Sequence, residues 1–196
     1  MSFYGFARGL VAIVYKMRFK VTVLGEENIP KSGPVIICSN HISNYDPPLV
    51  GITCSRHIHF LAKEELFSNK IIGKILRKVN AFPIKRGMRD RNALRQGLQV
   101  LKEGNVLGLF PEGTRSKTGE LKRGLAGAGF FALRSQAQII PCAIIGSYES
   151  KKLLVVYGKA VEMDTFREEK ANAQLVTDAI MNEIKKLKDN HPIETI

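Results

Sequence analysis

A histidine and an aspartate, separated by four residues, lie in a polar stretch, NHISNYDPP, and could act as a pair in proton transfer. A loop of this length can fold back so that the carboxylate of Asp46 accepts a hydrogen bond from one imidazole nitrogen of His41 and stabilises the imidazolium. The other ring nitrogen is then available as a general base near neutral pH. Because Asn, Asp and Pro also cluster in ordinary turns, the spacing alone leaves a purely structural turn open.

A second polar cluster follows an apolar run and consists of Glu112, Gly113, Thr114 and Arg115 within the stretch FPEGTRS. These side chains cannot continue into a core, so we expect them to line a rim. The glycine permits a tight turn with outward N–H groups, and the guanidinium of Arg115 matches the oxygens of a phosphate. The cluster predicts an anion-binding rim, with an ordinary polar loop as the alternative.

Two further clusters accompany short apolar runs. Lys85 and Arg86 follow one of them in FPIKRG and are a second candidate for phosphate binding, unless they form a solvated basic loop. Pro141 stands within IIPCAI and has no N–H to donate to a neighbouring strand. It predicts the start of a strand or an edge strand, with a purely architectural role.

The clusters must be positioned by the alternating strand and helix patterns around them. This alternation predicts an α/β domain with a mixed, mostly parallel sheet covered by helices. Ligands of such sheets bind just past the strand ends, which is where the polar clusters fall. Apolar runs predict strands at 19–24, 35–39, 58–62, 82–85, 106–110, 139–145 and 153–160, and helical spacing predicts helices at 47–54, 69–79, 90–102, 124–135 and 171–188.

Residues 1–18 predict an amphipathic helix lying in a membrane interface, ahead of a domain of residues 19–196. One side of this helix gathers aromatic and aliphatic side chains, and the other carries Arg8 and Lys16. Its uncharged stretch is far shorter than the roughly 20 residues that cross a bilayer, and its charges do not precede the apolar part as in a secretory signal. An ordinary first helix packed on the core is the alternative.

The chain is strongly basic, with 30 Lys and Arg against 18 Asp and Glu, a formal net charge of +12 over 196 residues. Such a balance indicates an anionic partner: nucleic acid, an anionic membrane surface, a phosphorylated substrate or an acidic protein. A nucleic-acid-binding module is the main alternative from another class, but the basic residues are scattered and no aromatic-interleaved block occurs. The three cysteines lack a C-x-x-C pattern, which disfavours disulfides and zinc and fits a reducing compartment.

Two weaker patterns predict other functions. Gly127, Gly129 and Ala132 match a dinucleotide-binding fingerprint, but a polar loop replaces the strand that should precede it, so close helix packing explains them better. His57 and His59 alternate on a predicted strand and could face one metal ion. Because no third ligand stands nearby, we expect no metal site.

Taken in order, the motifs NHISNYD, FPIKRG, FPEGTRS and IIPCAI resemble the four successive motifs of the 1-acylglycerol-3-phosphate (lysophosphatidic acid) acyltransferase family, over residues 30–145. The resemblance implies an α/β, membrane-associated enzyme of phospholipid biosynthesis. It would move a fatty acyl group from a thioester donor to the sn-2 hydroxyl of lysophosphatidic acid, giving phosphatidic acid. It would lie as a peripheral protein on the cytoplasmic face of the cell membrane.

The resemblance also assigns roles to individual residues. His41 corresponds to the base and Asp46 to its partner. Arg86 and the block 112–115 correspond to residues that bind the acceptor and its phosphate. Lys63 resembles a lysine found near the active centre, which makes it a candidate for contact with the oxyanion or the donor.

Two departures from the family pattern accompany these assignments. Lys85 stands where an aspartate or a second aromatic is common, and we expect it to help Arg86 bind phosphate. The membrane-spanning N-terminal anchor of some relatives is absent.

The substrates expected from the resemblance are a lysophospholipid and an acyl thioester. Acyl-CoA or acyl-ACP would serve as co-substrate without a cofactor, so acyl carrier protein and an anionic membrane surface are the expected partners and nucleic acid is not. Another lysophospholipid or a glycerol-phosphate acceptor remains open. No serine occupies a G-x-S-x-G elbow, and Cys142 lies in an apolar run, so we expect direct transfer without a covalent acyl-enzyme.

Overall fold

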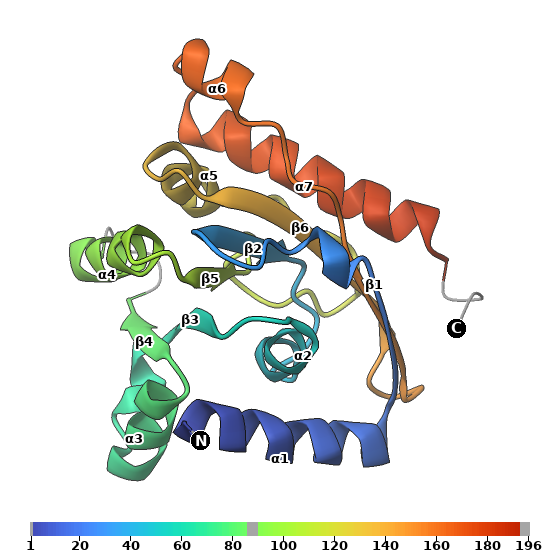
Figure 1. The fold of residues 1–196 in the computed structure, drawn as a ribbon. Coiled ribbons are helices and arrows are strands. Elements are labelled where there is room, and N and C mark those ends of the chain that lie inside the picture. Colours follow the sequence, from blue (N-terminus) through green and yellow to red (C-terminus); the bar gives the residue numbers. More distant parts are fainter. Residues whose placement is uncertain (1, 86–89, 193–196) are drawn as a thin grey trace.

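Seven strands form one sheet in the computed structural model, which describes residues 2–85 and 90–192 (Figure 1). Their order across the sheet is β1-β7-β6-β2-β5-β3-β4. The five strands from β6 to β4 are mutually parallel, and β7 joins β6 antiparallel, so the predicted mixed, mostly parallel sheet is confirmed. The strands are β1 (Lys20–Leu24), β2 (Val35–Ser39), β3 (Ile58–Lys63), β4 (Ala81–Ile84), β5 (Val106–Leu109), β6 (Gln138–Ser147) and β7 (Lys152–Tyr157).

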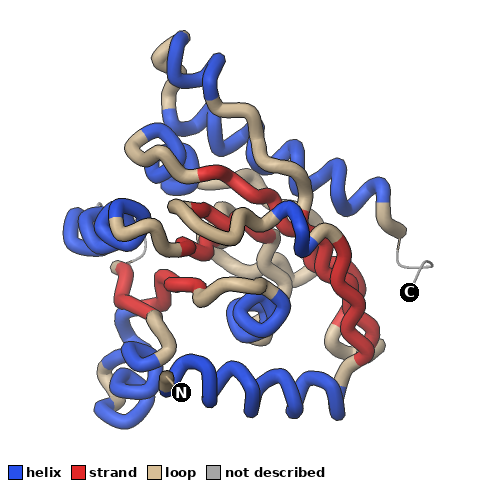
Figure 2. The backbone as a smooth tube through the Cα atoms, viewed as in Figure 1, coloured by secondary structure: helices blue, strands red, loops and turns tan. Residues whose placement is uncertain are grey.

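Helices cover both faces of this sheet (Figure 2). α4, α5 and α7 pack on one face, and α1 and α2 pack on the other. The helices are α1 (Phe3–Arg18), α2 (Asp46–Thr53), α3 (Lys70–Lys78), α4 (Arg91–Lys102), α5 (Gly127–Leu133), α6 (Asp164–Glu168) and α7 (Ala173–Asn190), with 3₁₀ turns η1 (Glu26–Asn28) and η2 (Glu64–Phe67).

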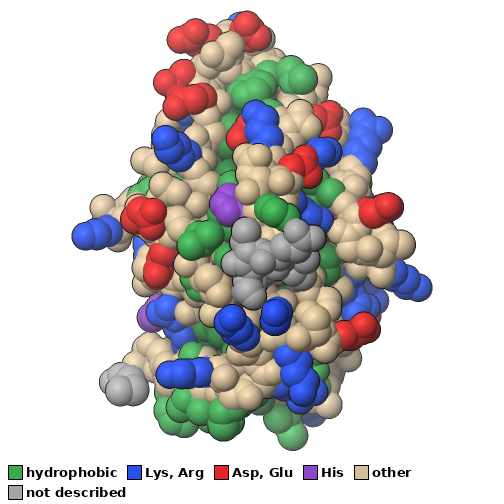
Figure 3. All heavy atoms as spheres, turned by 90° about the vertical axis from the view of Figure 1, so that its right-hand side faces the viewer, with side chains coloured by type: hydrophobic (Ala, Val, Ile, Leu, Met, Phe, Trp, Pro, Cys, Tyr) green, Lys and Arg blue, Asp and Glu red, His purple; other side chains and the backbone are tan. Residues whose placement is uncertain are grey.

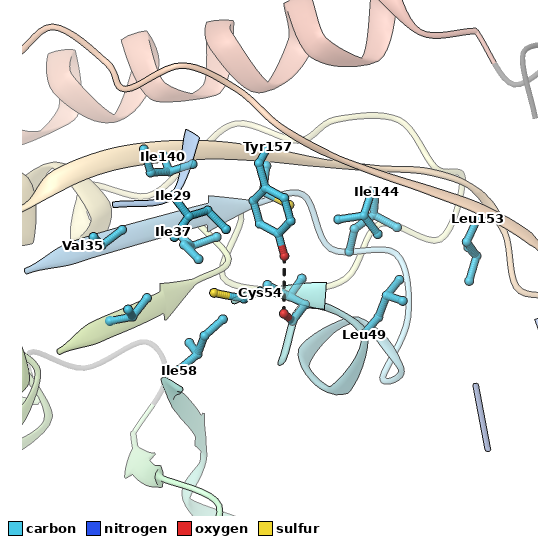
Figure 4. Close-up of a cluster of buried hydrophobic side chains, with 14 of the residues drawn as sticks. Ile29, Val35, Ile37, Leu49, Cys54, Ile58, Ile140, Ile144, Leu153 and Tyr157 are labelled. Atoms are coloured by element: carbon cyan, nitrogen blue, oxygen red, sulfur yellow. Dashed lines mark hydrogen bonds between the residues drawn. The ribbon is translucent and has the colours of Figure 1, made fainter. Parts of the chain in front are cut away.

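The central strand β2 shows why the core strands appear in the sequence as unbroken apolar runs. Val35 and Ile37 contribute to the cluster under α1 and α2, while Ile36 and Cys38 contribute to the cluster under α4, α5 and α7. A strand buried on both faces has no polar side to alternate with. Tyr157 points into the first cluster (Figure 4), and its hydroxyl is 2.8 Å from the hydroxyl of Thr53, so the buried phenol is satisfied.

The N-terminal helix α1 begins at a serine cap, where the Ser2 hydroxyl accepts a hydrogen bond from the Gly5 N–H at 3.2 Å. Arg8 donates to the carbonyls of Ile52 and Cys54 at the end of α2, at 3.1 and 2.6 Å, which holds α1 on the domain. The opposite side of α1 exposes six large apolar side chains, namely Phe3, Phe6, Leu10, Ile13, Val14 and Met17. In the described residues, no helix combines the length and apolar character needed to span a bilayer.

Three details differ from the predicted elements. Helix α5 is shorter than 124–135, and α6 and the two 3₁₀ turns were not predicted. Pro141 lies inside β6, which is a central strand and not an edge. The strand tolerates it because pairing with β7 starts only at the next residue, and the Pro141 carbonyl accepts from the Gly158 N–H just beyond the end of β7.

Close packing accounts for the glycine pattern on α5. A Cβ atom at Gly129 would lie 1.9 Å from the carbonyl oxygen of Ala173, so only glycine lets α5 approach the start of α7. The residues before α5 form no strand. Gly129 therefore serves close helix packing, as expected, and the segment is not a nucleotide-binding turn.

Candidate active site

The predicted His41–Asp46 pair is formed at the carboxyl end of β2. The chain leaves β2 after Ser39, and Asp46 opens helix α2. The His41 Nδ1 lies 2.7 Å from the Asp46 Oδ2, and the two residues are only 6% and 0% exposed. Asn40 fixes the loop to β6 through two hydrogen bonds with the main chain of Ile144, at 3.0 and 2.7 Å. The start of the loop is therefore fixed by Asn40, and its end is fixed by helix α2, which begins at Asp46.

The carboxylate of Asp46 is surrounded by hydrogen-bond donors. Its Oδ2 also accepts from the N–H groups of Ile42 and Ser43, at 2.6 and 2.7 Å. Its Oδ1 accepts from the hydroxyl of Tyr148 at 2.7 Å. Hydrogen bonds of this kind orient the carboxylate toward the imidazole.

Tyr148 is the residue of this site that the sequence did not indicate. It lies just beyond β6 and is separated from Asp46 by 102 positions. Burial raises the pKa of its phenol, and the nearby Asp46 carboxylate raises it further, so the hydroxyl stays protonated and donates. Nothing in the local sequence around Tyr148 marks it, because the contact depends on where the end of β6 meets the start of α2.

The ring of His41 stacks on Phe110, with centroids 4.2 Å apart and planes inclined by 25°, and Phe110 stacks in turn on Phe60. The second ring nitrogen, Nε2, has no hydrogen-bond partner among the described residues and is not sealed from solvent. A substrate hydroxyl can therefore reach the nitrogen that would act as base.

The cluster at 112–116 lies beside His41 because β2 and β5 are parallel neighbours in the sheet. The Ser116 N–H donates to the His41 carbonyl at 2.7 Å, and the His41 N–H donates to the Glu112 Oε1 at 2.8 Å. The other oxygen of Glu112 accepts from the Lys122 N–H at 3.0 Å. Glu112 is 4% exposed, and both of its oxygens accept from main-chain N–H groups, so it ties the His41 loop to the connection between β5 and α5 instead of facing solvent.

Gly113, Thr114 and Arg115 form the outer turn of the same cluster. Gly113 adopts a positive φ of 67°, and a Cβ atom there would lie 2.5 Å from the Leu125 side chain, so the turn requires glycine. Its N–H donates to the Phe110 carbonyl at 2.9 Å. No described residue accepts from the N–H of Thr114 or Arg115, and both side chains are exposed. These exposed groups form the part of the cluster at which the sequence predicts anion binding.

The remaining predicted residues lie along the ends of β3 and β4. Lys63 ends β3 and forms an ion pair with Glu65 at 3.0 Å. Lys85 follows β4 and pairs with Glu64 at 3.7 Å, and its N–H donates to Asp90 at 2.9 Å. Because β3 and β4 run parallel to β2 and β5, both lysines lie on the same edge of the sheet as His41. Arg86 lies outside the described residues.

The alternative chemistries find little support in the described residues. Cys142 is fully buried in β6, and burial raises the pKa of its thiol to about 12, which makes it a poor nucleophile. His57 lies before β3 with its ring 4.2 Å from that of Tyr4. Nowhere in residues 2–85 and 90–192 do three metal-ligating side chains gather.

Comparisons with known proteins agree with this geometry. A family model described as "Acyltransferase" matches residues 20–145. The 1-acyl-sn-glycerol-3-phosphate acyltransferase of Bacillus subtilis is 31% identical over 95% of this chain and 97% of its own length. The enzyme of the same description from Borreliella burgdorferi is 33% identical, over 64% of this chain and 51% of its own length.

A solved structure shares the fold as well as part of the sequence. The 1-acyl-sn-glycerophosphate (LPA) acyltransferase of Thermotoga maritima superposes with a TM-score of 0.77 at 26% identity, covering 94% of this chain and 79% of the other. The His41–Asp46 pair, the adjoining rim and the full-length sequence match all point the same way. The chain belongs to the acyltransferase family and is an acyltransferase enzyme related to the 1-acyl-sn-glycerol-3-phosphate acyltransferases.

Proposed function

We propose that this enzyme transfers a fatty acyl group from acyl-CoA or acyl-ACP to the sn-2 hydroxyl of lysophosphatidic acid, giving phosphatidic acid. The observation that carries the proposal is the buried His41–Asp46 pair, whose Nε2 has no hydrogen-bond partner among the described residues and whose main chain is bonded to the cluster that bears Thr114 and Arg115. A base beside an anion-binding rim suits an acceptor that combines a hydroxyl with a phosphate.

In the proposed reaction, His41 Nε2 removes the proton from the acceptor hydroxyl as its oxygen attacks the thioester carbonyl. The charge of Asp46 stabilises the imidazolium that forms. The tetrahedral intermediate then collapses, the carbon–sulfur bond breaks, and the imidazolium returns its proton to the departing thiolate. Atoms and charge balance without an acyl-enzyme, a metal or a cofactor.

The rim supplies the remaining charge stabilisation in this proposal. The N–H groups of Thr114 and Arg115, or the ammonium of Lys63, would receive the oxyanion. The side chain of Arg115, assisted by Lys85 and Arg86, would bind the acceptor phosphate and thereby choose which hydroxyl reaches His41. Glu112 would contribute to acceptor binding indirectly, by holding the loops of the rim in place.

The choice of substrate is tested by the reaction itself. Purified enzyme is incubated with acyl-CoA or acyl-ACP and a panel of lysophospholipids and glycerol 3-phosphate, and the products are identified by mass. Formation of phosphatidic acid in preference to the other products supports the proposal. Preferred acylation of another lysophospholipid or of glycerol 3-phosphate would identify that compound as the acceptor in place of lysophosphatidic acid. Strong binding to nucleic acid without lipid acylation would overturn the enzyme assignment.

Substitution of Arg115 by alanine is expected to raise the KM for the acceptor. Loss of a hydrogen-bonded ion pair with phosphate costs about 1.5–3 kcal/mol, which corresponds to about a 10–100-fold increase. The KM for the acyl donor should change much less. Steady-state kinetics with each substrate varied in turn provide the measurement.

The control is Arg134→Ala, which removes an exposed arginine between α5 and β6, at the opposite edge of the sheet. It should leave both KM values unchanged. An equal rise in the KM for both substrates in Arg115→Ala would remove its specific role toward phosphate.

We also propose that residues 1–18 lie in the membrane interface, so that the enzyme acts as a peripheral protein on the cytoplasmic face of the cell membrane. The support is the row of six exposed apolar side chains along α1, with Lys16 and Arg18 in its last turn. The lysophosphatidic acid acceptor would reach such an enzyme, and the phosphatidic acid product would leave it, by diffusion within the bilayer. Tyr15, which is buried and donates to the Tyr45 carbonyl at 2.7 Å, joins this helix to the His41 loop.

The double substitution of Phe6 and Ile13 by serine should weaken binding to anionic phospholipid vesicles by tenfold or more, because burial of each such side chain contributes about 1.5–3 kcal/mol. Both side chains are more than half exposed, so the fold should remain intact. Co-sedimentation with vesicles measures the partition, and thermal unfolding checks the fold. Undiminished binding would make α1 an ordinary packed helix.

A further inference from the structure

We infer that α3 is a second membrane-contacting helix, which binds the anionic surface of a phospholipid bilayer alongside α1. The inference rests on the proposed membrane association and extends it to a segment in the middle of the chain. Its starting point is that α3 exposes Ile71, Ile72 and Ile75, at 73%, 47% and 49%. Three large aliphatic side chains on one short helix form a patch that surface residues scattered singly do not.

The patch results from the way α3 rests on the domain. Gly73 is its buried residue, and a Cβ atom there would lie 2.9 Å from the Phe67 carbonyl. The side of α3 that packs on the domain is therefore the side of Gly73. Residues 71, 72 and 75 lie on the outward side, where only solvent or a binding partner can cover them.

The charges on α3 identify the partner. The helix KIIGKILRK contains no acidic residue, and its four cations are all exposed, namely Lys70, Lys74, Arg77 and Lys78. Isoleucines beside a row of lysines and arginines are the composition of a helix that inserts its apolar side chains between lipids and keeps its cations at the headgroups. An anionic bilayer can bury the isoleucine side chains and bind the cations of this surface at the same time.

A second copy of the chain fits the same patch poorly. Two copies joined through α3 would bring the four cations of each helix close to the four of the other, and like charges in contact oppose association. A bilayer presents the opposite charge instead.

The end of α3 adjoins the start of α1. The ammonium of Lys78 lies 4.9 Å from the centroid of the Phe3 ring, which joins the end of α3 to the start of α1. Figure 1 shows the two helices along the same lower side of the molecule. Figure 3, which views the molecule from the side away from α3, shows hydrophobic side chains at the lower end, where α1 lies, with Lys and Arg side chains just above them.

The position of α3 connects this surface to the catalytic edge of the sheet. The turn η2, whose Leu66 is exposed, leads from Lys63 at the end of β3 into α3. Glu64 of the same turn pairs with Lys85 after β4. A bilayer touching both helices would therefore flank the side of the site that carries Lys63 and Lys85, while α1 flanks the His41 loop through Tyr15.

The experiment compares three variants of the full chain by co-sedimentation with vesicles of phosphatidylcholine alone and of phosphatidylcholine mixed with phosphatidylglycerol. Ile71→Ser with Ile75→Ser removes the apolar patch, and Lys70→Gln with Lys74→Gln removes two cations. Leu175→Ser, which alters an exposed leucine on α7, is the matched control. Thermal unfolding and size-exclusion chromatography accompany each variant.

We expect the isoleucine variant to lose tenfold or more of its binding to the mixed vesicles, and the lysine variant to lose binding only where phosphatidylglycerol is present. The control should bind like the unaltered enzyme. Unchanged binding of both α3 variants, with binding lost in the α1 variant described above, would overturn the role of α3 and leave the membrane association standing. If the unaltered enzyme itself fails to bind the mixed vesicles, both the role of α3 and the proposed membrane association are contradicted. If the unaltered enzyme is a dimer, and the isoleucine variant is a monomer that still binds vesicles normally, the patch is instead the contact surface for a second copy of the chain.

Discussion

Replacing His41 by alanine is expected to lower kcat by about 10²–10⁴-fold, the contribution of a positioned general base. The acceptor hydroxyl would then lose its proton to water, because no described group besides the imidazole offers a basic atom next to the carboxylate of Asp46 and the rim. The KM for the acceptor should change little, since we propose that Arg115, and not His41, binds its phosphate. Steady-state kinetics with saturating substrates give the measurement.

Two further measurements separate loss of the base from loss of the fold. The ring of His41 is buried against Phe110, so its removal leaves a small cavity, and thermal unfolding reports the resulting destabilisation. Added imidazole can enter this cavity and should restore part of kcat in His41→Ala. The control His57→Ala, which alters an exposed histidine before β3, should retain full turnover. Near-normal turnover of His41→Ala would show that the imidazole is not the base.

The parts of the site that the sequence predicted depend on local spacing or on neighbouring parallel strands. His41 and Asp46 meet because the loop between them is short and ends at the first residue of α2. The rim at 112–115 lies beside them because polar residues that follow adjacent parallel strands emerge at the same edge of the sheet. Both relations can be read from a single chain once the strands are recognised by their apolar runs.

The parts that the sequence did not predict depend on contacts between distant segments. Tyr148 reaches Asp46 because the last residues of β6 pass over the start of α2, and no periodicity or motif encodes that crossing. The hydrogen-bond partners of Glu112 were likewise not predictable from its motif. The family resemblance placed Glu112 in the acceptor-binding block, and in the structure its two oxygens accept from the N–H groups of His41 and Lys122.

Pro141 shows how a sound general rule can fail at one position. Proline is excluded from the centre of a sheet because it cannot donate to the ladder. In β6 the ladder to β7 begins one residue later, at Cys142 opposite Tyr157, so the missing N–H breaks no pairing there. Strand order and register decide this outcome, and neither is determined by the local sequence.

The carboxylate of Asp46 leads to the second large expected effect. In Asp46→Asn, the amide oxygen can take the place of Oδ2 and accept from the ring N–H of His41 and the N–H groups of Ile42 and Ser43. The amide nitrogen then faces the Tyr148 hydroxyl, which can rotate to accept its hydrogen bond. The substitution therefore preserves shape and hydrogen bonding and removes only the negative charge.

Because that charge stabilises the imidazolium formed when His41 accepts a proton, kcat should fall by about 10²–10⁴-fold in Asp46→Asn with little change in either KM or in the thermal midpoint. Asp46→Ala would be a poorer probe, since it leaves four donors without their acceptor, at a cost of about 1–3 kcal/mol for each that stays buried and unpaired. Unchanged turnover in Asp46→Asn would mean that the carboxylate only positions the ring.

Tyr148→Phe separates charge from orientation at the same carboxylate. It removes one donor to Oδ1 and leaves the charge of Asp46 and its three other hydrogen bonds in place. A loss in kcat of about tenfold or less is therefore expected, well below that of Asp46→Asn, because the charge that stabilises the imidazolium remains and the main-chain donors still hold the carboxylate. Tyr148 would then be a positioning residue that acts through Asp46. An equally large loss in both variants would instead make orientation of the carboxylate, and not its charge, the quantity that limits proton transfer by His41.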